Sequence, residues 1–127
     1  DELTEEKNAI IDKEKLVEIN PELILLDLSG KELLDEDMQA DPNFYKSLDA
    51  FKNKKAYYIM PYFTYGMNFD TALLDMYYMG SLAHPDKFSD VDIAAKAAEI
   101  YTVFVGKDVY NDLLGTYPES FKESNVE

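Results

Sequence analysis

Residues Lys54–Phe88 read KKAYYIMPYFTYGMNFDTALLDMYYMGSLAHPDKF, and this stretch decides the fold. The run Ala56–Met60 predicts a strand, which Pro61 ends because proline has no N–H to offer a sheet. A helix capped by Asn68 or Asp70 is predicted to follow. Strand, loop and helix in this order are typical of an α/β protein, where ligands bind beyond the carboxyl ends of the strands.

The rest of the chain adds one more convincing strand and several helices. Leu23–Leu26 is a continuous apolar run between turn residues, which is typical of a strand buried on both faces. The predicted helices begin at caps or prolines and end at glycine or proline, and they cover residues 13–19, 31–39, 42–48, 90–105 and 109–114. The tail from Glu119 onward is polar and is predicted to fray.

Two helices carry apolar residues at helical spacing, and such a face normally packs against a core. In the helix after Asn68 the face consists of Phe69, Ala72, Leu73, Met76, Gly80 and Ala83. In the helix over residues 90–105 it consists of Ile93, Ala97, Ile100 and Phe104.

The element order predicts the α/β fold class: a three-layer α/β/α sandwich lobe with a small, mostly parallel sheet. A chain of 127 residues supports one domain, so we assign residues 1–127 to a single unit. Two strands form too small a sheet for this many helices, and we therefore expect an incomplete lobe of a larger protein.

The charge narrows the classes of partner. The net charge is −14, from 26 acidic residues against 12 basic ones, and every basic residue is a lysine. Nucleic acid is not an expected partner, because binding it requires cationic side chains on the phosphates. The absence of cysteine excludes disulfides, thiolate metal sites and cysteine nucleophiles.

Three phrases in order resemble a known family. They are DKEKLVEINPELILLDL (Asp12–Leu28), DPNFYKSLDAFKNKKAYYIMPY (Asp41–Tyr62) and GMNFDTALLDMYYMGSLAHPDKF (Gly66–Phe88). Together they resemble the C-terminal lobe of the solute-binding proteins of ABC importers for iron–siderophore complexes, haem and cobalamin, the FecB/BtuF-like class III periplasmic binding proteins. One departure is Asn53-Lys54, where the family usually has an Asn-Gly turn.

The resemblance implies a non-enzymatic transport component without a cofactor of its own. Its ligand would be an iron or cobalt chelate, held between this lobe and a missing N-terminal lobe. Its location would be extracytoplasmic, in the periplasm or lipid-anchored at the outer face of the cell membrane. Its protein partner would be the ABC transporter permease, whose basic residues Glu14 is expected to meet; helix-dipole stabilisation alone also accounts for Glu14.

The resemblance places ligand contacts on the loop after the second predicted strand, at Tyr62, Tyr65 and Asn68, with Tyr58 as a further candidate. Tyrosine suits a large chelate, because its ring stacks, its hydroxyl forms hydrogen bonds, and tyrosinate binds ferric iron. The alternative is that these tyrosines only pack. Tyr57 and Tyr58 point to opposite faces of a strand, so at least one is expected in the core.

Two other functions stay open. One is a fragment of a chelatase-like metal enzyme, which would need His84 or a carboxylate pair facing the crevice; neither a catalytic pair nor a metal site is predicted from the spacing. The acidic cluster Asp35-Glu36-Asp37 with Asp41 lacks the pattern of a calcium loop. The other is an interaction domain that uses the tyrosine cluster on a protein partner.

Overall fold

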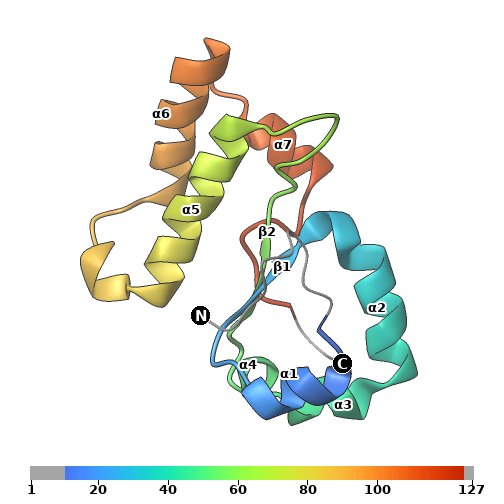
Figure 1. The fold of residues 1–127 in the computed structure, drawn as a ribbon. Coiled ribbons are helices and arrows are strands. Elements are labelled where there is room, and N and C mark those ends of the chain that lie inside the picture. The colour runs from blue at the N-terminus through green and yellow to red at the C-terminus, as the bar shows by residue number, and fades with distance from the viewer. Residues whose placement is uncertain (1–10, 125–127) are drawn as a thin grey trace.

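The computed structural model describes residues 11–124, which form a mixed α/β fold (Figure 1). Strands β1 (Ile24–Asp27) and β2 (Ala56–Ile59) make a two-stranded parallel sheet in which Ile24 pairs with Ala56. The helices are α1 (Lys13–Ile19), α2 (Lys31–Ala40), α3 (Pro42–Ser47), α4 (Asp49–Lys52), α5 (Phe69–Ala83), α6 (Ile93–Val105) and α7 (Tyr110–Thr116), with 3₁₀ turns at Leu28–Gly30 and Pro85–Lys87. The predicted α/β class with a small parallel sheet is confirmed.

The helices lie on both sides of the strands and at one end of them (Figure 1). Figure 1 shows α5 and α6 together on one side of the strands, with α2 on the other and α1, α3 and α4 gathered at one end. No helix within residues 11–124 is long and apolar enough to span a membrane.

Short-range polar contacts set the ends of the first helix. The Asp12 carboxylate accepts a hydrogen bond of 2.7 Å from the Lys15 backbone N–H, which is the predicted cap. Asn20 ends the helix in the left-handed conformation, with φ of 41°. Its side chain exchanges two 2.9 Å hydrogen bonds with Asp49, so the end of α1 is tied to the start of α4.

The predicted frayed tail is wrong for residues 121–124, which pair with the free edge of β2. The Phe121 N–H donates to the Tyr58 carbonyl and the Tyr58 N–H donates to the Lys122 carbonyl, both at 2.9 Å. The Ser124 N–H donates to the Ala56 carbonyl at 2.8 Å. Backbone groups on an open strand edge need partners, and this polar segment supplies them. Residues 125–127 lie outside the described residues.

The expected core face is right only in part for α5, because Leu73 packs against the core but the most buried positions lie elsewhere on the helix. Its buried residues are Thr71, Leu74, Asp75 and Tyr78, whereas Phe69 is 66% and Met76 is 54% exposed. Helix α5 packs on α6 through Leu74, which contacts Ala97, Ile100 and Tyr101 in one buried cluster. That packing leaves the face with Phe69 and Met76 uncovered.

On α6 the predicted stripe is right in part. Ala97 and Ile100 are buried against α5 and Ile93 packs on the same cluster, but Phe104 is 55% exposed. The last turn of α6 therefore extends beyond the core. Phe104 lies beside the exposed face of α5 that carries Phe69 and Met76.

Candidate functional site

An open groove lies beyond the carboxyl end of β2, between α5, the end of α6 and the loop 61–68. Its volume is about 650 Å³. Apolar and aromatic side chains dominate its lining, which includes Tyr62, Met67, Phe69, Met76, Met79 and Phe104. Its position matches the crevice in which α/β proteins bind ligands.

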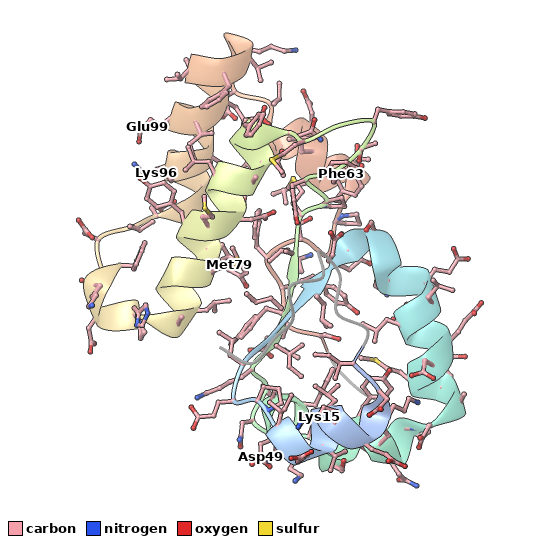
Figure 2. All side chains as sticks on the ribbon, viewed as in Figure 1. Lys15, Asp49, Phe63, Met79, Lys96 and Glu99 are labelled. Atoms are coloured by element: carbon pink, nitrogen blue, oxygen red, sulfur yellow. The ribbon has the colours of Figure 1, made fainter. Side chains whose placement is uncertain are left out.

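The loop 61–68 is closed at its base. The Asn68 N–H donates a 2.7 Å hydrogen bond to the Tyr62 carbonyl, and Phe63 forms an antiparallel bridge with Met67. Tyr65 and Gly66 form the tip with φ of 57° and 151°, values that suit glycine far better than tyrosine. The loop is therefore a short hairpin-like projection, and Figure 2 shows Phe63 on it.

The three loop residues that the resemblance gave as ligand contacts lie in three different environments. Tyr62 is half-buried and lines the groove. Tyr65 is fully exposed at the tip. Asn68 lines a smaller pocket of about 240 Å³ across the loop, with Thr64, Thr71 and Tyr101. Only Tyr62 therefore faces the groove.

Tyr58 lies in the core and away from the groove. It is 4% exposed, and its hydroxyl accepts a 3.2 Å hydrogen bond from Ser124 Oγ. The Lys31 ammonium lies 5.7 Å from the centre of its ring. Its neighbour Tyr57 packs edge-on against Tyr78 on the opposite face of the strand. Tyr58 therefore packs in the core, which is the alternative to ligand contact that the sequence left open for it.

Sequence reasoning missed the methionines and phenylalanines that make up half of the groove lining. The signal was present in the helical spacing of Phe69, Ala72, Leu73 and Met76, but it was assigned to the core. An apolar helix face predicts burial against something, and it does not distinguish a core from an open groove. Met67 and Phe104 come from two other segments, so no local pattern joined them to this face.

Asp75 was also missed, and it is the one ionisable carboxylate among the lining residues. It is 2% exposed, and its Oδ1 accepts a 3.1 Å hydrogen bond from the Met60 backbone N–H. Its Oδ2 has no hydrogen-bond partner among the described residues. Burial, together with the nearby Asp27 carboxylate, raises the pKa of Asp75 to about 7, although the Met60 hydrogen bond opposes the rise.

Glu14 is exposed in the first turn of α1, far from the groove. Figure 2 places its neighbour Lys15 at the opposite end of the molecule from Phe63. A contact through Glu14 would therefore leave the groove free.

The histidine and the acidic cluster lie outside the groove. His84 is exposed at the end of α5 that is farther from loop 61–68. Asp37 bonds with Lys13 and Tyr45, which hold its pKa below the usual value, while Asp35 pairs with Lys31 and Asp41 caps α3. Within residues 11–124 no three His, Asp or Glu side chains are grouped to hold a metal ion.

No family model matches the chain, and no curated protein matches it. The function proposed below therefore rests on the groove and on the residues that form it.

Proposed function

We propose that this chain is the C-terminal lobe of an extracytoplasmic solute-binding protein that delivers a metal chelate to an ABC importer. The chelate would be an iron–siderophore complex, haem or a corrinoid. The lobe would be a three-layer α/β/α sandwich whose sheet is incomplete in this chain. One observation carries the proposal: an open, largely apolar groove with Tyr62 in its wall lies beyond the carboxyl end of β2.

The chemistry of the groove supports a neutral or weakly charged ligand. Its lining offers aromatic rings and methionine thioethers, which adapt to irregular apolar shapes. No lysine of residues 11–124 lines it, and the chain contains no arginine, so this lining offers no cation to a strongly anionic chelate. Tyr62 lines the groove, and in this proposal its hydroxyl would hydrogen-bond the ligand or bind its ferric ion.

The exposure of the lining supports a two-walled site. Phe69, Met76 and Phe104 are 66%, 54% and 55% exposed, which is unusual for a cluster of large apolar side chains. A ligand with a second lobe beyond it would bury this surface. The groove would then be one wall of a cleft.

Glu14 supports a delivery role by its position. It is an exposed carboxylate on α1, remote from the groove, and it could meet a basic residue of the permease while the ligand stays bound. This arrangement would place the protein outside the cytoplasm, at the outer face of the membrane that holds the permease.

A second candidate is a protein-interaction domain. It is favoured by the projecting loop, on which Phe63 is 69% exposed and Tyr65 is fully exposed. The concave groove beside the loop favours a small ligand over a flat protein surface.

Equilibrium dialysis of the chain against hemin, a ferric tris-catecholate and cyanocobalamin tests the proposal. The chain has no tryptophan, so tyrosine fluorescence, corrected for chelate absorption, gives a second readout. Phe104→Ser should weaken binding about tenfold, since it removes an exposed aromatic ring that a bound chelate would cover. Val103→Ser is the matched control, because Val103 is 76% exposed on the same turn and does not line the groove. Absence of binding by all three chelates would overturn the proposal.

A further inference from the structure

Asp75 has one satisfied and one unsatisfied carboxylate oxygen at the groove. The Met60 N–H occupies Oδ1 at 3.1 Å, and nothing among the described residues bonds to Oδ2. An acceptor that is buried without a partner destabilises the protein, because it has lost its water and gained nothing in return. A donor that reached Oδ2 would recover that loss.

No cation among residues 11–124 forms an ion pair with this carboxylate. The ion pairs of the described residues engage Lys13, Lys15, Lys31, Lys52 and Lys96, and none of them includes Asp75. The Asp27 carboxylate at the end of β1 carries a charge of like sign and raises the pKa of Asp75. The wall of the groove therefore contains one carboxyl group, that of Asp75, which is either ionised or protonated. The other lining residues are apolar or, in the case of Tyr62, phenolic.

We propose that Asp75 determines which ligands the groove accepts: Oδ2 takes a hydrogen bond from an amine, amide or hydroxyl donor on the ligand and disfavours a ligand carboxylate at that point. The inference rests on the proposed function only in taking the groove as the binding site. It adds a requirement that the apolar lining does not impose, since rings and thioethers offer no strong hydrogen-bond acceptor to a ligand donor.

Oδ2 is shielded from solvent, so a ligand donor reaches it by displacing part of the lining. The neighbouring lining residues on α5 are Met76 and Met79. Methionine is unbranched and has three rotatable bonds beyond the backbone, so it changes conformation at little cost. A small donor group on an aromatic ligand needs only such a movement, while the ring stays on Phe69 and Phe104.

Three naphthalene probes test the proposal on the whole chain. They share one ring system and differ in one substituent: 1-naphthylmethylamine, 1-naphthalenemethanol and 1-naphthoic acid. Dialysis at pH 8 in 0.3 M NaCl screens the attraction of the acidic protein for any cation. We expect the amine to bind on the order of tenfold to a hundredfold more tightly than the naphthoate, with the alcohol between them.

Two variants separate Asp75 from the net charge. Asp75→Asn keeps an acceptor for the Met60 N–H but replaces the free acceptor by a donor, so the preference for the amine should vanish. Asp70→Asn removes the same charge from the same helix at a position outside the groove lining, so the preference should remain. Loss of the preference in both variants would overturn the inference, because net charge would then explain it.

The wild-type chain gives a readout that does not depend on the folding of a variant. Lowering the pH from 8 to 5.5 protonates Asp75, and the ratio of amine to naphthoate affinity should fall. The other ionisable groups facing Asp75 are Asp27 on β1 and Tyr101 on α6, and His84 lies exposed at the far end of α5. Equal binding of the three probes would overturn the role of Asp75 and leave the groove as a site. Absence of binding by every probe would overturn the groove itself.

Discussion

The Met60 N–H and Asp75 Oδ1 lie 3.1 Å apart, and this hydrogen bond joins the end of β2 to the middle of α5. Met60 is the last residue before Pro61 starts the groove loop, and its N–H lies beyond the strand pairing of β2. A buried N–H needs an acceptor, and Asp75 supplies one from the helix. The same side chain therefore anchors the loop and presents its second oxygen beneath the groove.

Asp75 should make stability depend on pH. Its pKa in the folded chain is about 7 against an ordinary value of 3.8, so the folded state holds the proton more tightly than the unfolded state. Its contribution is therefore fully present below about pH 4 and is lost as the pH rises through about 7. Urea unfolding gives the free energy of unfolding of the wild type and of Asp75→Asn at each pH. The wild-type value minus the variant value should fall by on the order of 1 kcal/mol per pH unit as the pH rises from 5 to 7. A constant difference between pH 5 and 7 would contradict a raised pKa of Asp75 in the folded chain.

Gly80→Ala should destabilise the chain through Phe88. A Cβ at this position would lie 2.4 Å from the tip of the Phe88 ring, which also packs edge-on against Tyr77. The clash should outweigh the gain of about 1 kcal/mol in helix propensity and give a net loss of about 1–2 kcal/mol.

The control for Gly80→Ala is the same substitution in a Phe88→Leu chain. Leucine leaves room for the new methyl group, so the helix-propensity gain should then dominate and Gly80→Ala should stabilise that chain. Thermal unfolding of the four chains forms a double-mutant cycle. A negligible coupling between the two positions would contradict the close approach of α5 and Phe88.

Lys54→Gly should stabilise the turn before β2. Lys54 is exposed and has φ of 57°, where a side chain is strained and glycine is not. The substitution should raise the free energy of unfolding by about 0.5–1 kcal/mol, measured by urea unfolding. Lys55→Gly is the matched control, since Lys55 does not have positive φ; it should bring no gain.

Glu14→Lys should separate delivery from binding. Since Glu14 is remote from the groove, chelate affinity should not change, while stimulation of ATP hydrolysis by a reconstituted permease should fall severalfold. Glu18→Lys makes the same charge change one turn later on α1 and should have a smaller effect. Equal losses for the two variants would argue against a specific contact at Glu14.

The elements were predictable because their signals are local. Asp12 caps α1 and Asn20-Pro21 ends it within a few residues, so the predicted bounds 13–19 agree with the structure. Pro61 likewise ends the second strand close to its predicted end. The pairing of residues 121–124 with β2 has no local signal, because it joins segments separated by about half the chain.

The location of the groove was predictable from the sequence, but most of the residues that line it were not. The loop after β2 does border the groove, but the side to which each loop residue turns depends on how the loop closes between Tyr62 and Asn68. The orientation of α5 depends on its packing against α6, and this decides that Asp75 is buried while Phe69 is exposed. That packing is a property of the assembled fold, and the apolar period alone did not reveal it.

The pairing of residues 121–124 with β2 also sets an order of events in folding. During synthesis β1, β2 and α5 are complete long before this segment exists. The backbone N–H and carbonyl of Tyr58 can therefore form their hydrogen bonds with Lys122 and Phe121 only at a late stage. The Ser124–Tyr58 hydrogen bond spans 66 residues, and contacts of such long range form slowly. A nascent chain thus exposes one edge of its central strand until nearly all of these residues have been made. Its acidic character would keep such partly folded chains apart during that interval.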